Sequence, residues 1–287
     1  MPENYKLVRL ANGNFSVRSL AENETFHPIA GPVVEAQSIY VEQLRICERL
    51  KEHSGEFVVW DVGLGAGGNV LTLLNTTKEI SCALRIISFD STLEPFRFAL
   101  KHSEELGFFN GYENVAEQLL HEGKVQFQNL NQRVAWEIRL GDFPSILSQE
   151  TRKPIHERIP SPDAIFFDAF SPAKNAAMWT APLFANLFAL LNPSRACSLA
   201  TFSRSTMARV AMLLGGFFVG SGKSIAGKEE TTIAANRLEL IENPLRRDWL
   251  ERAKKSHSAE PLWEAVYRQA ALSEITWKKM CGQPQFS

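Results

Sequence analysis

The chain has 287 residues, of which 45% are hydrophobic and 22% are charged. This composition is typical of a globular protein, and its apolar stretches are far shorter than the roughly 18 residues that a membrane-spanning helix needs. The 31 Lys and Arg residues nearly balance the 32 Asp and Glu residues, and this net charge of −1 gives no general indication of nucleic-acid binding. The charged N-terminus lacks a signal-peptide pattern, and the four cysteines show no metal or disulfide spacing. We therefore expect a cytoplasmic protein without a metal site.

Residues 1–55 predict a β-hairpin followed by a helix that packs on the core. Lys6–Leu10 and Asn14–Arg18 alternate apolar and polar positions around a turn-forming Ala-Asn-Gly sequence. Apolar residues then recur at intervals of three and four from Val33 to Cys47, which is the period of a helix.

Residues 56–241 predict an α/β core domain. Seven strand segments are expected: Phe57–Val62, Leu84–Phe89, Val134–Leu140, Ala164–Phe167, Ser198–Phe202, Phe217–Val219 and Thr231–Ala235. Their alternation with helical segments is typical of a mostly parallel sheet covered on both faces. Only a loop separates the last two strands, which predicts a terminal antiparallel hairpin.

Two helices of this core have recognisable N-caps. Thr180 precedes an apolar stripe that stops at Asn192-Pro193, and Ser203 precedes a second stripe that ends at Gly215-Gly216. Threonine and serine side chains accept hydrogen bonds from the first free N–H groups of a helix. We therefore expect both helices to begin directly after these residues.

Two segments do not follow the alternation of strands and helices. Residues 108–133, between the second and third predicted strands, are amphipathic and rich in Gln and Asn. Residues 242–287 are charged and carry aromatic residues at helical intervals. Both segments predict helical additions to the core, the second as a C-terminal helical tail.

A glycine-rich segment follows the first core strand and opens a helix. Gly63, Gly65 and Gly68 fit the dinucleotide-binding fingerprint, while Asp61, Gly63, Gly65 and Gly67 fit the pattern of methyltransferases that use S-adenosyl-L-methionine (SAM). Asp61 favours SAM, because a carboxylate would attract the ammonium of a methionine moiety and would repel a pyrophosphate. A glycine turn without a ligand is the remaining alternative.

Acidic residues follow or end three further strands. Asp90 is placed where either cofactor would have its ribose hydroxyls bound by a carboxylate. Asp142 and Phe143 are placed where methyltransferases hold adenine, with a helix or turn cap as the alternative for Asp142. Asp168 ends the fourth strand, and ligands of open α/β sheets bind outside this edge. We expect Asp168 to border the reaction centre, with a purely structural carboxylate as the alternative.

The segment from Phe167 to Trp179 resembles the D-x-F-x-P-x-K-N-P-x-M-W motif of the MnmC methyltransferase domain. That family of bacterial enzymes modifies the wobble uridine of tRNA. The residues from Glu35 to Tyr40 resemble the family's E-x-x-x-x-Y/F helix, and those from Gly222 to Glu229 are similar to its G-x-G-R-K-R-E loop. Together the matches cover roughly residues 26–235, which is most of the chain.

The sequence also departs from the family pattern. Ala176 replaces a proline, and the basic loop has lost two positive charges. The FAD-dependent oxidase half of the bifunctional enzyme is absent, which predicts a stand-alone methyltransferase.

The resemblance implies a class I SAM-dependent methyltransferase with a Rossmann-like fold. The implied reaction is N-methylation of the 5-aminomethyl group of the tRNA wobble (2-thio)uridine to 5-methylaminomethyl. The anticodon region of tRNA would be the partner, and a separate enzyme would make the aminomethyl intermediate. Two alternatives remain open: a SAM-dependent methyl- or aminopropyl-transferase acting on a small-molecule amine, and a non-catalytic protein that binds SAM or RNA.

The motifs assign residues to three roles. Asp168 and Phe170 are the predicted catalytic residues, Asp168 orienting the amine or accepting its proton. The predicted cofactor-binding residues are Glu35, Tyr40, Asp61, Gly63, Gly65, Gly67, Asn69, Asp90, Asp142 and Phe143. The predicted substrate-binding residues are Ser171, Pro172, Lys174, Trp179, Lys223 and Lys228. Phe170 and Trp179 are candidates for stacking on a flipped-out uridine, with core packing an equal alternative for Trp179. The six histidines show no metal spacing and receive no role.

Positive charge is concentrated in one part of the chain. Between Ala169 and Lys228 there are six basic residues and no acidic ones: Lys174, Arg195, Arg204, Arg209, Lys223 and Lys228. This block predicts RNA binding that is concentrated on one face and sensitive to salt.

Overall fold

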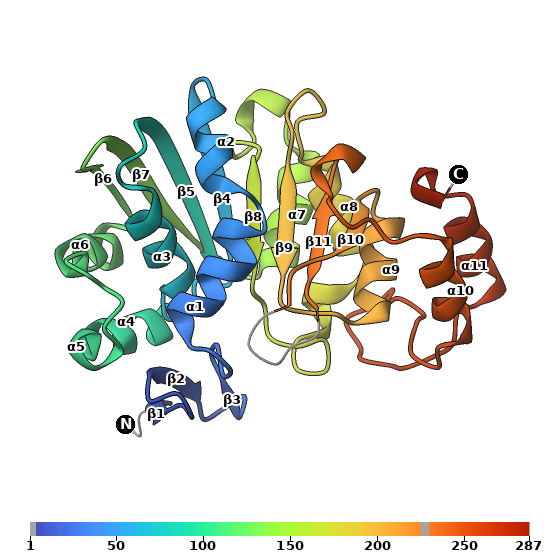
Figure 1. The fold of residues 1–287 in the computed structure, drawn as a ribbon, viewed down its shortest axis with the longest axis horizontal. Coiled ribbons are helices and arrows are strands. Elements are labelled where there is room, and N and C mark those ends of the chain that lie inside the picture. Colours follow the sequence, from blue (N-terminus) through green and yellow to red (C-terminus); the bar gives the residue numbers. More distant parts are fainter. Residues whose placement is uncertain (1–3, 225–229, 287) are drawn as a thin grey trace. The chain divides into compact units, whose positions relative to one another are not determined.

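The computed structural model describes residues 4–224 and 230–286. Figure 1 shows the ribbon coloured along the sequence. The chain divides into two compact units. Unit 1 comprises Met1–Asp142, Ala164–Asp168 and Lys223–Glu229, and unit 2 comprises Phe143–Asp163, Ala169–Gly222 and Glu230–Ser287. In the part of the chain that the structure describes, no helix is long and apolar enough to cross a membrane.

The sheet of unit 1 has the strand order β8-β4-β5-β7-β6. Four of its strands run parallel: β4 (Glu56–Val62), β5 (Cys82–Asp90), β7 (Gln132–Leu140) and β8 (Ala164–Phe167). Every residue of β4 from Phe57 to Val62 is buried, as expected for a central strand covered on both faces. These four strands match the predicted core segments.

The predicted insertion at residues 108–133 is wrong in part, because only its first half is helical. Helix α6 (Glu113–Glu122) is followed by β6 (Lys124–Asn129), which pairs antiparallel with β7. Val125 and Asn129 are buried while Lys124, Gln126 and Gln128 are exposed, so β6 follows the two-residue period of a strand.

The helices of unit 1 differ from the prediction at one place, where one long helix was expected. They are α1 (Pro32–Ala36), the π-helical η1 (Gln37–Glu42), α2 (Ile46–Glu52), α3 (Gly68–Thr77), α4 (Glu94–Lys101), α5 (Ser103–Leu106) and α6. The helix expected from Val33 to Cys47 is broken by the π-helical turn and by Arg45, whose φ of 52° is left-handed. Helix α1 packs against α3 (Figure 1).

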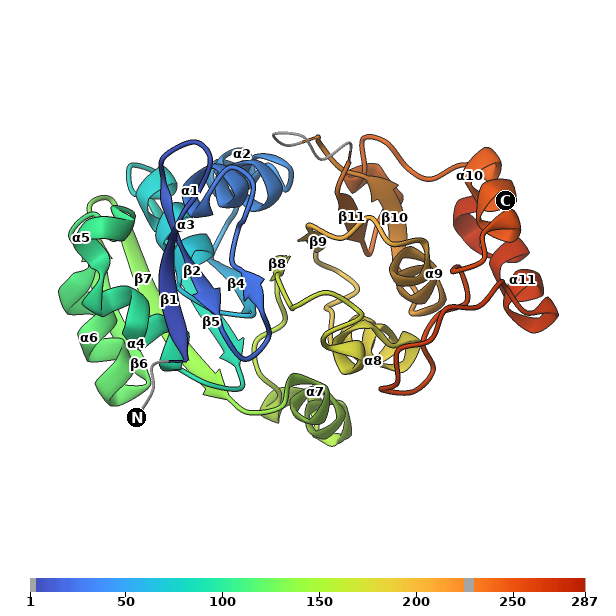
Figure 2. The ribbon, with the colours of Figure 1, turned by 90° about the horizontal axis from the view of Figure 1, so that it is seen from below.

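The predicted N-terminal hairpin is confirmed. Strands β1 (Tyr5–Arg9) and β2 (Phe15–Ser19) pair antiparallel, and β3 (Glu24–Thr25) adds a short third strand. Strand β2 contacts α4 and α5 (Figure 2), and the ring of Tyr5 lies 6.2 Å from that of Phe98. The hairpin is therefore anchored to the helical part of unit 1.

Unit 2 contains an antiparallel sheet with the order β10-β11-β9. Its strands are β9 (Ser198–Thr201), β10 (Phe218–Ser221) and β11 (Thr232–Ala235), which confirms the predicted terminal hairpin. Its α-helices are α7 (Phe143–Arg152), α8 (Ala181–Ala189), α9 (Thr206–Leu214), α10 (Arg247–Lys255) and α11 (Glu274–Cys281), and 3-10 turns occur at η2 (Ile155–Glu157), η3 (Ala176–Trp179), η4 (Leu238–Leu240) and η5 (Pro284–Phe286).

One of the two predicted helix caps is confirmed. The Thr180 hydroxyl accepts a hydrogen bond from the N–H of Leu183 at 3.2 Å, so α8 begins where the sequence indicates. The cap at Ser203 is wrong, because α9 begins two residues later with Ser205 at its N-cap. The Ser203 hydroxyl instead accepts from the N–H of Ser205 at 3.3 Å, which stabilises the turn before the helix.

The C-terminal segment of unit 2 lies along β10. The side-chain amide of Gln285 accepts from the N–H of Val219 and donates to its carbonyl, each at 2.6 Å. The N–H of Ser221 donates to Asn243 at 3.0 Å, and the N–H of Leu245 donates to Val219 at 2.9 Å. These contacts tie the residues after η4 to the sheet.

We expect Gly67→Ala to destabilise unit 1 more than Gly107→Ala does. Both glycines have left-handed φ angles, 82° and 68°. A Cβ at Gly67 would lie 2.5 Å from the ring of Phe96, whereas one at Gly107 would meet nothing within 4 Å. Each variant should lose about 1–2 kcal/mol from backbone strain, and Gly67→Ala a further 1–3 kcal/mol or so from overpacking. Urea unfolding of both variants measures the difference, and equal losses would contradict this account.

Candidate active site

Three carboxylates lie at the carboxyl end of the parallel strands of unit 1. Asp61 is the penultimate residue of β4, Asp90 is the last of β5, and Asp168 directly follows β8. The N–H of Asp168 donates to the carbonyl of Val62 at 2.9 Å, which continues the pairing of β8 with β4. Because these strands are neighbours, the sheet brings the three residues to one edge, as the sequence predicts.

The glycine loop between β4 and α3 is fastened to the end of β5. The N–H of Gly63 donates to the carbonyl of Phe89, and the N–H of Gly65 donates to the Asp90 carboxylate, both at 2.9 Å. The φ angles of 97° and 51° at these glycines lie in the left-handed region. Burial raises the pKa of Asp90, and the N–H groups of Gly65 and Thr92 oppose that rise by stabilising the carboxylate.

Asp61 is fully buried and has one oxygen with a partner and one without. The Ser88 hydroxyl donates to Oδ2 at 2.8 Å and itself accepts from the indole N–H of Trp136 at 2.9 Å. Within residues 4–224 and 230–286, Oδ1 has no hydrogen-bond partner. Burial raises the pKa of Asp61 to about 7, and the charges of Asp168 and Asp90 contribute to the rise. A buried carboxylate of this kind is suited to a cationic ligand.

Asp168 belongs to a cluster with a histidine to which the sequence analysis assigned no role. The amide of Asn69 donates to Oδ2 of Asp168 at 2.8 Å, and Nε2 of His27 lies 3.3 Å from the same oxygen. Nε2 of His27 is also 3.1 Å from the amide oxygen of Asn69. Burial alone would raise the pKa of Asp168, but the hydrogen bond and charge of His27, with the Asn69 hydrogen bond, lower it.

Two anchors hold His27 in this cluster. Its φ of 48° is left-handed, an unfavourable conformation for histidine. Before it, the N–H of Phe26 donates to a carbonyl of β2 at 2.8 Å. After it, the N–H groups of Ile29 and Ala30 donate to one oxygen of Glu35, at 2.9 and 3.0 Å. Glu35, a predicted cofactor residue, therefore fixes the loop that carries His27.

Tyr40, another predicted cofactor residue, lies on η1 with its ring centroid 4.9 Å from that of Phe166. Its hydroxyl is buried and forms no hydrogen bond with the described residues. Burial raises the pKa of the phenol well above 10, and the nearby charge of Asp168 raises it further. Tyr40 is therefore a neutral side chain beside Asp168.

The predicted substrate-binding residues of unit 2 divide into a partly exposed loop and a buried tryptophan. Trp179 is 0% exposed, and its indole N–H donates to the carbonyl of Phe170 at 2.8 Å. The structure therefore favours core packing for Trp179 over stacking on a base. Phe170, Ser171 and Pro172 are partly exposed, and Lys174 is exposed.

The remaining predicted residues take varied positions. In unit 1, Asp142 is exposed, and the backbone N–H of exposed Lys223 donates to the Gln43 side chain at 2.8 Å. In unit 2, Phe143 is buried as the first residue of α7. Lys228 lies outside the described residues.

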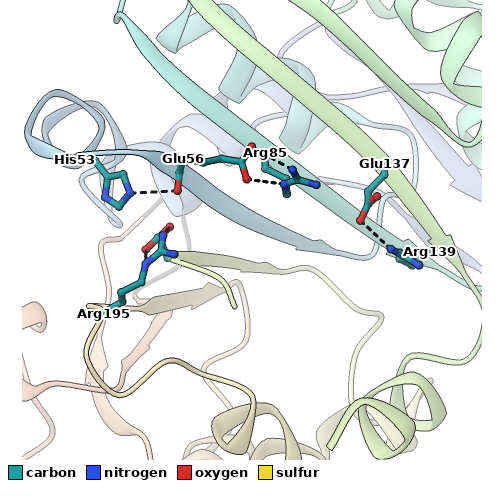
Figure 3. Close-up of polar contacts among 7 residues, drawn as sticks. His53, Glu56, Arg85, Glu137, Arg139 and Arg195 are labelled. Atoms are coloured by element: carbon teal, nitrogen blue, oxygen red, sulfur yellow. Dashed lines mark hydrogen bonds and ion pairs between the residues drawn. The ribbon is translucent and has the colours of Figure 1, made fainter. Parts of the chain in front are cut away.

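The prediction of a positive face built from six basic residues is wrong for two of them. Arg195 (Figure 3) forms an ion pair with the buried Asp163, its Nε lying 2.9 Å from Oδ1. Arg209 is 2% exposed, and it donates to Glu230 at 2.9 Å and to the carbonyl of Thr231 at 2.8 Å. Acidic residues just outside the block therefore neutralise both charges inside unit 2.

Other charged groups on the strands of unit 1 form ion pairs with one another. Arg85 donates to both oxygens of Glu56, at 2.7 and 3.3 Å, and Arg139 donates to Glu137 at 3.2 Å (Figure 3). Among the residues that the structure describes, no group of three or more His, Cys, Asp or Glu side chains is arranged to hold a metal ion.

Comparison with known proteins defines the class. Residues 110–237 match a family model described as S-adenosyl-L-methionine-dependent methyltransferase. The crystal structure of MnmC2 from Aquifex aeolicus superposes with a TM-score of 0.70 at 23% identity, covering 96% of this chain and 84% of that one. A spermidine synthase in complex with the transition-state analogue AdoDATO superposes with a TM-score of 0.51 at 12% identity, with the same coverage. Residues 110–237 are thus similar to SAM-dependent methyltransferases, and the chain has the fold of such enzymes.

The chain is similar to MnmC proteins, which confirms the resemblance seen in the motifs. It is 29% identical over 222 residues to the tRNA 5-methylaminomethyl-2-thiouridine biosynthesis bifunctional protein MnmC of Aeromonas hydrophila, covering 71% of this chain and 31% of that protein. The MnmC protein of Campylobacter concisus is 25% identical over 254 residues, covering 85% of this chain and 38% of that protein. The chain thus spans about a third of the length of these relatives.

We expect Asp61→Asn to change how stability depends on pH. Folding raises the Asp61 pKa to about 7, so its proton stabilises the folded state fully below about pH 4, and this contribution is lost as the pH rises through 7. Its full size is on the order of 4 kcal/mol. Asparagine resembles the protonated acid and does not titrate. Urea unfolding across this range should therefore show wild type losing stability relative to the variant as the pH rises, and parallel curves would contradict the assignment.

Proposed function

We propose that the chain is an N-methyltransferase that uses SAM to convert the 5-aminomethyl group of the tRNA wobble (2-thio)uridine to 5-methylaminomethyl. The observation that carries the proposal is Asp168, which begins the MnmC-like motif and lies at the carboxyl edge of the unit 1 sheet. The name of the relatives, which refers to 5-methylaminomethyl-2-thiouridine in tRNA, supports the same product.

The sheet edge that carries Asp61, Asp90 and Asp168 is suited to binding SAM. Oδ1 of Asp61, which has no partner among the described residues, is suited to the ammonium of the methionine moiety of SAM. Asp90 is suited to its ribose hydroxyls. Gly63 and Gly65 hold the loop in left-handed backbone conformations that a Cβ would strain. We assign the adenine to Asp142 and Phe143, which follow β7. When bound, SAM supplies a methyl group on a sulfonium that is a good leaving group.

The contribution of Asp168 is to orient the amine. Holding reactants in the correct geometry can supply about 7–11 kcal/mol of a barrier. The amine must be neutral to attack, and for a pKa near 10 this costs about 4 kcal/mol at pH 7. An isolated carboxylate would increase that cost by favouring the ammonium form.

We assign the RNA contacts to the loop that begins at Phe170 and to two lysines. Phe170 is partly exposed, and its aromatic ring is the group we assign to stacking on a splayed base. Lys174 and Lys223 are exposed and suited to phosphate oxygens. We assign Ser171 and Pro172, which lie between Phe170 and Lys174 in the sequence, to the same contacts.

The test is an assay with tRNA from cells that lack the methyl step. The protein is incubated with SAM and this tRNA, and the nucleosides are examined by mass spectrometry. We expect the aminomethyl nucleoside to become methylaminomethyl. Methyl or aminopropyl transfer to a polyamine or a free amine, with no change in the tRNA, would favour the small-molecule alternative and contradict the proposal.

We expect Asp168→Asn to lower turnover on the order of 10²-fold or more while changing SAM affinity little. Asparagine keeps the size of the side chain and removes the charge that orients the amine. The matched control is Asp248→Asn, because Asp248 is 73% exposed on α10 of unit 2. Steady-state kinetics and calorimetric titration with SAM give the two readouts. Parallel loss of SAM binding and turnover would make Asp168 a cofactor or structural residue.

SAM affinity should have an acidic limb set by Asp61. Below its pKa of about 7 the carboxyl group is neutral and cannot pair with an ammonium, so the dissociation constant should rise toward tenfold per pH unit. Above about pH 8 the affinity should fall again as the α-amino group of SAM loses its proton. Asp61→Asn should remove the acidic limb in fluorescence titrations. An unchanged limb in the variant would assign it to another group.

A further inference from the structure

The hydrogen bonds around His27 fix which of its nitrogens carries a proton. Nε2 faces two acceptors, Oδ2 of Asp168 at 3.3 Å and the amide oxygen of Asn69 at 3.1 Å. Two acceptors require a donor between them, so Nε2 is protonated in either charge state of the ring. Because Asn69 also donates to Asp168 at 2.8 Å, the three side chains close a triangle.

The groups that face His27 are acidic or neutral. Asp168 contacts it directly, and the carboxylates of Glu35 and Asp61 interact with its charge. The phenol of Tyr40 lies beside Asp168 in its neutral form. Burial lowers the pKa of His27, but the hydrogen bond and charge of Asp168 raise it overall.

The backbone indicates that this placement is specific. A non-glycine residue at φ 48° is unfavourable and persists only where the surrounding structure holds it. Glu35 supplies that hold through two backbone N–H groups on the far side of Pro28. The strained backbone at His27 thus keeps its imidazole in contact with Asp168.

We propose that His27 is a positioning residue that compensates the charge of Asp168, so that the carboxylate orients the substrate amine without stabilising it as ammonium. This inference rests on the proposed function, because it requires an amine substrate. With His27 protonated, the pair is neutral overall and leaves the pKa of the amine close to that of a free amine. The amine loses its proton to solvent before attack, its lone pair forms the new C–N bond, and the C–S electron pair leaves with sulfur.

The kinetic test compares His27→Gln with His121→Gln, a histidine exposed on α6. Glutamine can still donate to Asp168 but carries no charge. The kcat/KM for tRNA should fall about tenfold near pH 7, which corresponds to a rise of one unit in the pKa of the bound amine. The loss should shrink as the pH rises, because His27 of wild type then loses the charge that the variant lacks. His121→Gln should follow wild type throughout.

A structural role for His27 would give a different result. It would scale kcat/KM by one factor at every pH, and it would lower the melting temperature and the SAM affinity together. A pH-independent loss of that kind would overturn the proposal. Circular dichroism and SAM titration of His27→Gln distinguish a misfolded variant from an active one.

A second measurement needs no substrate and no turnover. NMR titration of the imidazole resonances should give His27 in wild type a pKa above the ordinary value for histidine, and Asp168→Asn should lower it. An unchanged His27 pKa in Asp168→Asn would overturn the pairing even if tRNA is methylated. Conversely, a paired His27 in a protein that does not methylate tRNA would contradict the proposed function while leaving the pairing intact.

Discussion

The burial of three carboxylates, Asp61, Asp90 and Asp168, is the constraint on which the site in unit 1 depends. The neighbouring strands β4, β5 and β8 bring these carboxylates to one edge, where burial penalises their charge. Backbone N–H groups stabilise Asp90, and Asn69 and His27 stabilise Asp168. Asp61 accepts a hydrogen bond from the Ser88 hydroxyl, and its Oδ1 has no partner among the described residues. Burial and the charges of the other two carboxylates raise its pKa to about 7. At this edge of the sheet, Asp61 is therefore the carboxylate that a bound cation would stabilise.

Meeting this constraint uses unfavourable backbone conformations. Gly63 and Gly65 adopt left-handed φ angles that let the loop reach the carbonyl of Phe89 and the carboxylate of Asp90. His27 adopts such an angle without the freedom of a glycine. Hydrogen bonds to the hairpin before His27 and to Glu35 after it stabilise this conformation. The N-terminal residues of unit 1 therefore position the imidazole beside Asp168.

The sequence predicted what depends on local pattern and left out what depends on tertiary contacts. Buried strands announce themselves as apolar runs, and an acidic residue at the end of such a run is visible without a structure, as for Asp90. His27 is separated by 42 positions from Asn69, which is 99 positions from Asp168, so no spacing indicated their contact. The burial of Arg209 depends likewise on Glu230 across a loop. Strand β6 did have a two-residue period, but its polar residues concealed it within an amphipathic segment.

The bonding of Gln285 to Val219 has a consequence for how the molecule meets copies of itself. A strand at the edge of a sheet offers unpaired N–H and C=O groups to any extended chain, and this invites aggregation. On β10, the N–H and C=O groups of Val219 bond to the side-chain amide of Gln285, as they would to a residue of a neighbouring strand. Backbone hydrogen bonds of Asn243 and Leu245 to β10 extend this pairing. The C-terminal segment therefore covers the edge of β10 and blocks the pairing of another chain with it.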